Sequence, residues 1–382
     1  MNFTFWLSLL AFLGSAATLI EIARGLRKLR HLNDSAPAPR ENCPDISIVL
    51  AALDEADTIE PALRSVLALD YARLEIIAVN DRSTDATGEI LERLALEQPK
   101  LRVLHVRELP AGWLGKNHAL FQGAQLAGGD YLLFTDADVV FQPSVIARAA
   151  AHCELNRLDH LAVFPSVPVT EPLLAMLLLM FKGALLSRYK PWKAPHSPRH
   201  FLGIGAFNMV RASVYRKAGG HGAIPLAVLD DIVLGRLMKQ HGGRQEILNG
   251  SGAIAVEWYR STRQLIRGVR KNAFASLDYS MAKLLGATAL LLLVRFWPWI
   301  GLLATDGAAW WLNLAAILAA LAFYLDLLRD TGWSRWCLAF MPVSSLVAIY
   351  ALWNGSLSAL LGGGIEWRGT RYSLDELRRA HR

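Results

Sequence analysis

An apolar stretch that ends in two closely spaced carboxylates constrains this chain more than any other feature. Residues 131–135 (Tyr-Leu-Leu-Phe-Thr) have the composition of a buried strand, and Asp136 and Asp138 follow directly. Because residues i and i+2 of a strand share a face, both carboxylates can point into the space beyond the strand end. A divalent cation that prefers hard oxygen ligands, Mg²⁺ or Mn²⁺, would relieve their repulsion. On this pattern alone, a turn that happens to contain two acids fits equally well.

Segments of strand and helix character alternate upstream of this pair. The patterns predict strands over residues 46–53, 74–79, 101–106 and 131–135, and helices over 59–67 and 116–126. Such alternation predicts an α/β fold with a mostly parallel, doubly wound sheet and flanking helices, whose ligands bind beyond the carboxyl ends of the strands. Asp54, Glu55 and Asp81 fall at those ends, together with the aspartate pair. No dinucleotide-binding or P-loop glycine motif is present, so the sequence predicts an acid-rich, metal-dependent diphosphate site.

Apolar residues are concentrated outside this α/β pattern. They make up 53% of the chain, and the mean hydropathy of +0.28 is high for a wholly soluble protein. Residues 3–22 contain no charge before Glu21 and are long enough to span a bilayer; a cleaved signal peptide is the alternative, but the basic n-region is missing. Further long apolar stretches lie near 284–304, 308–328 and 336–361. We therefore expect a multi-pass protein of the inner (cytoplasmic) membrane.

The expected organisation has five parts. These are an N-terminal anchor (1–24), a basic flank with a linker (25–45), a catalytic domain (46–280), a C-terminal transmembrane module of two to three spans (281–362) and a basic tail (363–382). Within the catalytic domain, a helix near 172–188 is too short in its apolar part to span and is expected to lie in the membrane interface, with a buried core helix as the alternative.

The charge distribution favours a membrane surface or a phosphate ligand over nucleic acid. The net charge is +7 and the pI is about 9.4, and basic clusters adjoin the apolar stretches at 24–31, 188–200, 260–271 and 368–382. The positive-inside rule places residue 24 onward, and with it the catalytic domain, in the cytoplasm. One plus three spans would leave the basic tail outside, so one stretch is expected to be re-entrant or interfacial. The three cysteines form neither a disulfide framework nor a zinc pattern.

Five short motifs occur in order between about residues 45 and 275. They are Leu53-Asp54-Glu55, Val79-Asn80-Asp81-Arg82-Ser83-Thr84-Asp85, Gly115-Lys116-Asn117-His118-Ala119-Leu120, Thr135-Asp136-Ala137-Asp138 and Leu229-Asp230-Asp231. Together they resemble the membrane-bound family 2 glycosyltransferases of the GT-A fold. The resemblance implies that Asp81 contacts the uracil or ribose of a UDP-sugar, that Asp138 binds the metal on the diphosphate, and that Asp136 lies near ribose and metal. We assign Asp54 and Glu55 to donor binding as well.

The resemblance also implies a general base at Asp231, which opens a helix after the Gly219-Gly220 turn. Asp230 stands where the family usually has glutamate, so either acid could serve. A metal on the diphosphate stabilises the leaving UDP, while a carboxylate on the opposite face of the sugar takes the proton of an acceptor hydroxyl, with inversion. The alternative is that these two acids only cap a helix N-terminus.

Lys116, Gln264 and Arg267 complete the expected donor site. Lys116 follows a glycine-rich turn and could meet phosphate at a helix start, with a solvated lysine as the alternative. Gln264 and Arg267 resemble the Q-x-x-R-W motif of membrane-bound members, and Arg267 is expected to reach the diphosphate; an interfacial helix whose bases meet lipid phosphates is the alternative. Gly268 replaces the tryptophan of that motif, which argues against a growing glycan at this position.

The tail points to the acceptor. Residues 365–372 (Ile-Glu-Trp-Arg-Gly-Thr-Arg-Tyr) are similar to the W-[RK]-G-x-x-Y ending of ceramide, carotenoid and hopanoid glucosyltransferase relatives. We therefore expect an inverting transferase that moves a hexose or N-acetylhexosamine from a UDP-sugar to a lipid or polyisoprenoid at the cytoplasmic membrane face. The alternatives are a processive polysaccharide synthase and a membrane scaffold that binds a nucleotide-sugar without turnover.

Overall fold

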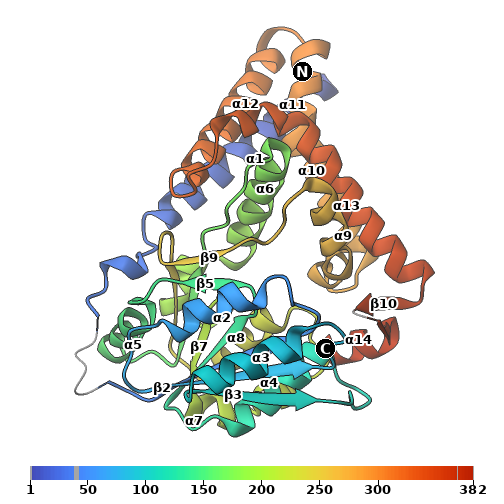
Figure 1. Ribbon diagram of the computed structural model, residues 1–382. Coiled ribbons are helices and arrows are strands. Elements are labelled where there is room, and N and C mark those ends of the chain that lie inside the picture. Colours follow the sequence, from blue (N-terminus) through green and yellow to red (C-terminus); the bar gives the residue numbers. More distant parts are fainter. Residues whose placement is uncertain (1, 38–42, 368, 382) are drawn as a thin grey trace. The chain divides into compact units, whose positions relative to one another are not determined.

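The computed structural model describes residues 2–37, 43–367 and 369–381, and its chain folds into two compact units (Figure 1). The sheet unit comprises Leu29–Val167 and Pro191–Glu257, and the membrane unit comprises Met1–Lys28, Pro168–Lys190 and Trp258–Arg382. The expected catalytic domain of 46–280 contains segments of both units. Part of the expected linker (38–42) and two bases of the expected tail (Arg368 and Arg382) lie outside the described residues.

The sheet unit is built on a seven-stranded sheet of order β3-β2-β1-β4-β7-β6-β8. The strands are β1 (Ile46–Ala52), β2 (Leu74–Asp81), β3 (Leu101–Val106), β4 (Tyr131–Asp136), β6 (His160–Phe164), β7 (Asn208–Arg211) and β8 (Gln245–Asn249). All neighbours are parallel except β7, which runs antiparallel between β4 and β6. The predicted α/β fold with a mostly parallel sheet is confirmed.

Helices cover both faces of this sheet. They are α2 (Ile59–Leu67), α3 (Thr87–Glu97) and α5 (Val145–Asn156) on one face, and α4 (Gly115–Leu126), α7 (Ala212–Lys217) and α8 (Asp230–Gln240) on the other. Successive strand residues supply the two cores, because Ile48 and Leu50 pack into the first and Val49 into the second. Short 3₁₀ turns occur at η1 (Leu32–Asp34), η3 (Pro191–His196) and η4 (Gly220–Ala223).

A second, two-stranded sheet lies directly after the aspartate pair. β5 (Val139–Phe141) pairs antiparallel with β9 (Ile254–Val256), and Val139 faces Val256. The pairing holds the chain at Asp138 against the last strand of the sheet unit.

The membrane unit consists almost entirely of helices. They are α1 (Phe3–Leu26), α6 (Pro172–Tyr189), α9 (Thr262–Ala273), η5 (Ala275–Leu277), α10 (Met281–Leu291), the π-helical turn η6 (Leu292–Phe296), α11 (Trp297–Ala304), α12 (Gly307–Leu328), η7 (Arg335–Phe340), α13 (Met341–Leu361) and α14 (Leu374–His381). Five helical segments of the described chain are long and apolar enough to cross a membrane: Phe3–Leu26, Pro172–His196, Met281–Ala304, Gly307–Leu328 and Arg335–Leu361. The chain therefore has the helices of a membrane protein.

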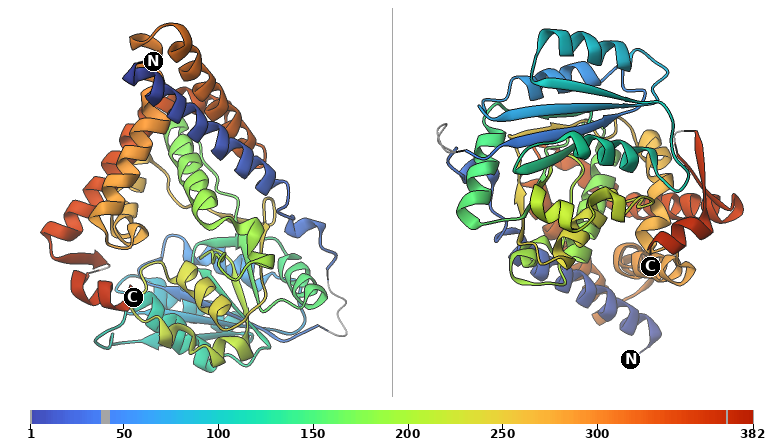
Figure 2. Two further views of the ribbon diagram at one scale, coloured as in Figure 1. Left: turned by 180° about the vertical axis from the view of Figure 1, so that it is seen from behind. Right: turned by 90° about the horizontal axis from the view of Figure 1, so that it is seen from below.

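Small residues allow α1 and α12 to lie side by side (Figure 2). The buried face of α1 includes Ser8, Ala11 and Ser15, a spacing that follows the helical repeat. Ser8 accepts hydrogen bonds from Asn313 Nδ2 at 2.8 Å and from the Trp297 indole at 3.3 Å. These polar contacts tie α1 to both α11 and α12.

The amphipathic helix α9 and the C-terminal tail pack together. Leu265 is buried on α9, whereas Gln264 and Arg267 are exposed. The tail forms a hairpin of β10 (Gly364–Trp367) and β11 (Thr370–Ser373), and the Lys271 ammonium lies 4.1 Å above the Trp367 ring. The tail thus covers part of α9.

The structure explains the glycine at position 268. A Cβ atom there would lie 2.4 Å from Cε1 of Tyr259, whose ring stacks on Trp258. A tryptophan at this position would therefore collide with Tyr259 in the present packing.

Candidate active site

The aspartate pair lies at the carboxyl end of the central strand. Asp136 is the last residue of β4, and Asp138 directly precedes β5. Burial, with the charges of Asp136 and Glu55 nearby, raises the pKa of Asp138 to about 6. Because a raised pKa reports an unfavourable carboxylate charge, a cation near this pair would be stabilised electrostatically.

A divalent metal fits this donor set only in part. The described residues contain no group of three or more His, Cys, Asp or Glu side chains that could hold a metal ion. Two aspartates would leave most positions of an octahedral ion to water or to the oxygens of a ligand, which is how Mg²⁺ is usually bound beside phosphates. The residues therefore suit a metal that arrives with a diphosphate.

Lys116 lies between the aspartate pair and the start of α8. Its ammonium is 2.8 Å from Asp136 Oδ1 and 3.1 Å from Asp230 Oδ2. Burial alone would lower the pKa of Lys116, but the carboxylates of Asp136, Asp230 and Asp231 raise it well above its usual value. Lys116 is thus a fixed cation among three carboxylates and not a solvated side chain.

Asn117 holds the start of α4 against the loop that leads to α8. Its buried amide donates to the carbonyl oxygens of Ile224, Pro225 and Ala227 at 3.0–3.2 Å. The backbone N–H of Leu114 donates to Pro225 as well, at 2.9 Å. These bonds bring Lys116 opposite Asp230. Sequence reasoning missed this role, because Asn117 and its partners are more than 100 residues apart.

Asp231 opens α8 and is held by two backbone donors. Its Oδ1 accepts from Ile232 N at 2.8 Å, and its Oδ2 accepts from Gly205 N at 2.9 Å. Burial and the neighbouring charge of Asp230 raise the pKa of Asp231 to about 7, although Lys116 acts in the opposite direction. A carboxylate with a pKa near neutrality is matched to proton transfer at physiological pH.

A glycine loop connects this acid to the aspartate pair. Gly205 donates its N–H to Asp231, and its carbonyl oxygen accepts from Asp136 N at 3.1 Å. A Cβ atom on Gly205 would lie 2.6 Å from Asp136 Oδ2, and one on Gly203 would lie 1.8 Å from Asp231 O. Only glycine permits this close approach. The Gly-x-Gly spacing before β7 was the signal that could have identified the loop.

Asp81 is the last residue of β2, and its carboxylate is covered by Arg82. Arg82 Nε and Nη2 donate to the Asp81 carboxylate at 2.8 and 3.1 Å, and the Asp81 side chain is only 4% exposed. Beside them lies a hollow of about 530 Å³, lined by Asn80, Arg82, Ser83, His105, Val106 and Arg107. This volume lies within the range of small-molecule sites.

Asp54 and Glu55 connect the loop that follows β1 with the loop that follows β2. Asp54 Oδ1 accepts from Thr84 N at 2.8 Å, and Glu55 N donates to Thr87 Oγ1 at 2.8 Å. Asp54 has a left-handed backbone with a φ of 52°, and its carboxylate faces the neighbouring loop. These contacts stabilise the edge of the site, and donor contact by either acid stays a prediction.

The structure brings eight of the ten predicted site residues together in the sheet unit. They are Asp54, Glu55, Asp81, Lys116, Asp136, Asp138, Asp230 and Asp231. Gln264 and Arg267 lie on α9 of the membrane unit, where Gln264 Oε1 accepts from Arg260 N at 2.7 Å. Their contact with the donor stays a prediction.

Comparisons with known proteins identify relatives of part of the chain. Residues 47–214 match the family model "Glycosyl transferase family 2". An uncharacterised glycosyltransferase of Haemophilus influenzae is 29% identical over 158 residues, which are 41% of this chain and 45% of that protein. A poly-β-1,6-N-acetyl-D-glucosamine synthase of Staphylococcus aureus is 36% identical over 115 residues, which are 30% of this chain and 27% of that protein. The chain thus matches less than half the length of either relative.

One solved structure shares the fold over nearly the whole chain. The mannosyltransferase PcManGT of Pyrobaculum calidifontis, solved with GDP-Man and Mn²⁺, superposes with a TM-score of 0.58 at 18% sequence identity. The similarity covers 94% of this chain and 99% of that one. At this identity it supports the fold alone.

Proposed function

The chain carries a glycosyltransferase family 2 domain over residues 47–214, and we propose that it transfers a hexose or N-acetylhexosamine from a UDP-sugar to a membrane lipid or polyisoprenoid. One observation carries this proposal: the carboxylate of Asp231, with a pKa near 7, is linked through the single residue Gly205 to the aspartate pair at the end of β4. A base for the acceptor and a cation site for the diphosphate therefore lie on either side of one glycine loop.

The chain's own residues divide the reaction between them. Asp231 takes the proton from the acceptor hydroxyl, and the Gly205 and Ile232 N–H groups fix its carboxylate for that transfer. Asp230 is paired with Lys116 and keeps that cation beside Asp231. Because the base takes the proton on the face of the sugar opposite the leaving group, a single displacement inverts the anomeric carbon.

Asp138 and Asp136 would hold a divalent metal, Mg²⁺ or Mn²⁺. When bound, such an ion supplies charge neutralisation for the departing diphosphate. The Asp81 carboxylate lies at the end of β2, which is separated from β4 by β1, and a nucleoside can meet it there once Arg82 shifts from its present bidentate pairing. Arg82 then becomes a candidate partner for the nucleotide.

The arrangement of strands favours a membrane-surface position for α6. This helix connects β6 to β7, and these two strands are hydrogen-bonded neighbours with His160 opposite Val210. A single crossing by α6 would put the two strands on opposite sides of the bilayer. Both ends of the helix must therefore lie on the same side of the bilayer, as those of an interfacial or re-entrant helix do.

The last long apolar helix, α13, also returns to the side on which it starts. The Arg27 guanidinium, at the end of α1, lies 3.8 Å from the Asp326 carboxylate, near the end of α12. These two helices therefore end on the same side, and α13 starts there. Near its own end, Ser358 accepts from Arg270 of α9 at 2.8 Å. Three crossings, by α1, α10–α11 and α12, then leave the tail on the side of α9. We propose that the catalytic domain and the basic tail both face the cytoplasm, as the charge distribution favours.

A processive polysaccharide synthase is the second candidate, favoured by the similarity to the Staphylococcus aureus synthase over 115 residues. Against it stands Gly268, where Tyr259 fills the space of the missing tryptophan. A scaffold that binds a nucleotide-sugar without turnover is the third candidate. A scaffold, however, would not need a carboxylate with a pKa of about 7 at Asp231.

The test is to incubate membranes that contain the protein with a panel of UDP-sugars and GDP-mannose, and to analyse the lipid extract by mass spectrometry. Membranes with Asp231→Asn are the matched control. We expect a new glycolipid with one UDP-sugar and the wild-type protein only. A polymer instead of a glycolipid would establish the synthase, whereas nucleotide binding without product or UDP release would establish the scaffold.

A further inference from the structure

Three polar side chains in the core of the sheet unit form one hydrogen-bonded cluster. They are His160 of β6, Asn208 of β7 and Gln245 of β8, and each is at most 2% exposed. In the register of the sheet, His160 lies opposite both Val210 and Gln245, so the three side chains share the face that α8 covers. Polar groups buried in this way are costly unless every one of them is hydrogen-bonded.

Every polar atom of the cluster has a partner. The backbone N–H of Leu202 donates to Gln245 Oε1, so the amide nitrogen of Gln245 faces His160. Because an amide nitrogen can only donate, His160 Nδ1 accepts from it, and the Nε2–H of the same ring donates to Asn208 Oδ1. Burial lowers the pKa of His160 to about 4, so the ring is neutral at physiological pH and can fill both roles at once.

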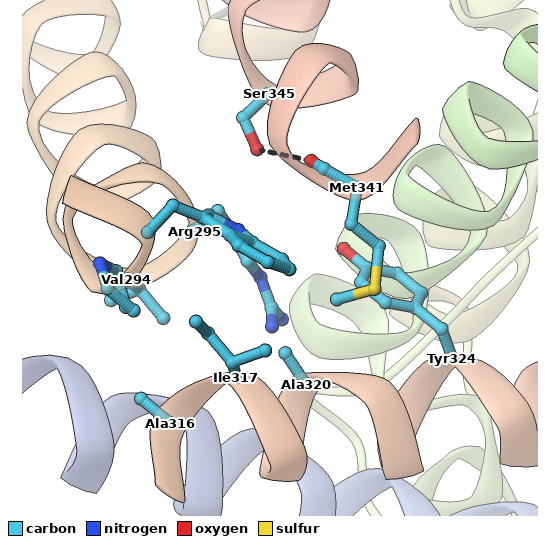
Figure 3. A pocket seen from close by; sticks show the side chains of 10 residues that line it. Val294, Arg295, Ala316, Ile317, Ala320, Tyr324, Met341 and Ser345 are labelled. Carbon is cyan, nitrogen blue, oxygen red and sulfur yellow. Dashed lines mark hydrogen bonds between the residues drawn. The ribbon is translucent and has the colours of Figure 1, made fainter. Parts of the chain in front are cut away.

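Complete pairing distinguishes this cluster from another buried polar group of the chain. Arg295, in the π-helical turn η6 of the membrane unit, has a buried Nη1 with no hydrogen-bond partner among the residues that the structure describes. Figure 3 shows its side chain near Ile317 and Ala320, beside a space of about 10 Å³, which has room for no more than one water molecule. Packing holds Arg295 there, whereas the bonds of His160 have defined directions and join distant segments.

Gln245 joins the glycine loop to helix α8. Its Oε1 accepts from Leu202 N at 3.0 Å, and its Nε2 donates to Gly235 O at 3.1 Å. The loop and the helix approach closely here, because a Cβ atom on Gly235 would lie 2.8 Å from Gly203 N. The bond to His160 fixes which end of the Gln245 amide faces each partner. Gln245 thus sets the distance between the loop and α8.

Asn208 extends the cluster to the first turn of α8. Its Nδ2 donates to Asp231 O at 3.3 Å, while His160 holds its Oδ1. A Cβ atom on Gly203 would lie 2.9 Å from the same Nδ2 and 1.8 Å from Asp231 O, so this glycine lies directly against the bond. Two residues further along the loop, Gly205 N donates to the Asp231 carboxylate at 2.9 Å. The cluster therefore holds in place both partners of the bond between Gly205 and Asp231.

We propose that His160, Asn208 and Gln245 are positioning residues that keep the Gly205 N–H on the carboxylate of Asp231. This inference rests on the proposed function, in which Asp231 is the general base. A hydrogen bond donated to a carboxylate stabilises its charged form, so loss of the Gly205 bond would make Asp231 ionise only at a higher pH. His160 is fully buried, so it acts on the reaction through Asp231 and not by contact with a substrate.

The test compares His160→Phe with His160→Gln. Phenylalanine keeps a ring of similar size but has no polar atom, so Asn208 and Gln245 each lose one bond. A glutamine side chain can again donate to Asn208 through its nitrogen and accept from Gln245 through its oxygen. His152→Phe is the matched control, because this histidine is also buried but bonds to Glu246, which follows Gln245 and points to the opposite face of β8.

The first measurement is the pH profile of turnover. For each variant, kcat/KM is obtained from the rate of UDP release between pH 5 and pH 9, with the UDP-sugar that is active in wild-type membranes. We expect the acidic limb of His160→Phe to lie about one pH unit above that of wild type, which is roughly a tenfold loss of kcat/KM at pH 6. His160→Gln and His152→Phe should keep the wild-type limb. An unchanged limb in His160→Phe, or an equal displacement in His160→Gln, would overturn the proposal.

The second measurement needs no turnover. The melting temperature of each variant is compared with that of the same variant carrying Asp231→Asn, from pH 5 to pH 9. In wild type this difference should level off near pH 7, and in His160→Phe it should still grow between pH 7 and pH 8. If no UDP-sugar gives UDP release in wild type, the proposed function fails, and the melting curves alone decide the positioning of Asp231.

A variant of the neighbouring amide guards against loss of folding. If His160→Phe does not fold, Gln245→Met takes its place, because methionine has a similar size and removes the bonds to Leu202 and Gly235. The same displacement to higher pH is expected. Melting differences that level off at the same pH in wild type and Gln245→Met would overturn the proposal.

Discussion

Replacing Asp231 by asparagine separates proton transfer from donor binding. Asparagine keeps the shape of the side chain and one oxygen for the Gly205 N–H, but it cannot take a proton from the acceptor. Loss of a general base typically costs a factor of about 10²–10⁴ in rate. Since the base acts in the transition state, kcat should fall by this factor while the affinity for the metal–nucleotide complex stays within about twofold.

The same substitution should stabilise the fold at alkaline pH. The pKa of Asp231 rises from 3.8 in an exposed aspartate to about 7 in the folded protein, which corresponds to roughly 4 kcal/mol. Because the folded state binds this proton more tightly than the unfolded state, the carboxylate destabilises the fold increasingly from pH 4 to pH 7, and fully above pH 7. Asparagine removes that cost and loses one hydrogen bond of about 1 kcal/mol. The net gain at pH 8 is therefore about 3 kcal/mol at most.

Two measurements check these values. Isothermal titration calorimetry with UDP and Mn²⁺ gives the affinity for the nucleotide, and the rate of UDP release gives the turnover. For the wild-type protein, kcat/KM should rise as the pH passes through about 7. Thermal melting should show a gain for Asp231→Asn that shrinks by more than half between pH 8 and pH 5. Asp70→Asn, an exposed aspartate of the same unit, is the control. Turnover by Asp231→Asn within tenfold of wild type, or loss of nucleotide binding, would refute the role assigned to Asp231.

Three further substitutions test the rest of the site. Asp138→Asn should weaken Mn²⁺-dependent nucleotide binding about tenfold or more, and chelation of the metal should do the same in the wild-type protein. Unchanged nucleotide affinity in Asp138→Asn would show that Asp138 is not part of the cation site. Lys116→Met should move the acidic limb of the pH–rate profile to higher pH, because Lys116 lowers the pKa of Asp231; an unchanged profile would contradict this. Gly205→Ala should reduce turnover, since its Cβ would lie 2.6 Å from Asp136 Oδ2, whereas Gly128→Ala, with its nearest atom at 3.6 Å, should not.

The first half of the sheet could be predicted because its signals are local. Runs of apolar residues predict buried strands, and apolar residues that recur every 3.6 positions predict helices. The strand predicted over 101–106, for example, has the same bounds as β3. The second half could not be predicted in the same way. β6 and β8 are short, and β7 enters between β4 and β6 after an excursion of more than forty residues. The order of such strands depends on packing between distant segments.

The acids of the site could be predicted, but not the contacts among them. A carboxylate at the end of a parallel strand is visible as a pattern, so Asp81, Asp136 and Asp138 were accessible from the sequence. The ion pair of Lys116 with Asp230 joins residues that are 114 positions apart. The bond from Gly205 to Asp231 depends on a loop shape that only the folded chain defines.

Lys116 makes the two halves of the site interdependent. Its ammonium touches Asp136 on the donor side and Asp230 on the base side, so one cation is shared by both. Asp138→Asn should therefore change nucleotide affinity alone and Asp231→Asn turnover alone, whereas Lys116→Met should change both. The effects of substitutions within one ion-pair network are not additive in free energy. The turnover of the double variant Lys116→Met/Asp231→Asn should therefore fall by a much smaller factor than the product of the two single-variant factors. If the effects multiply, Lys116 acts on the reaction by a route that does not pass through Asp231.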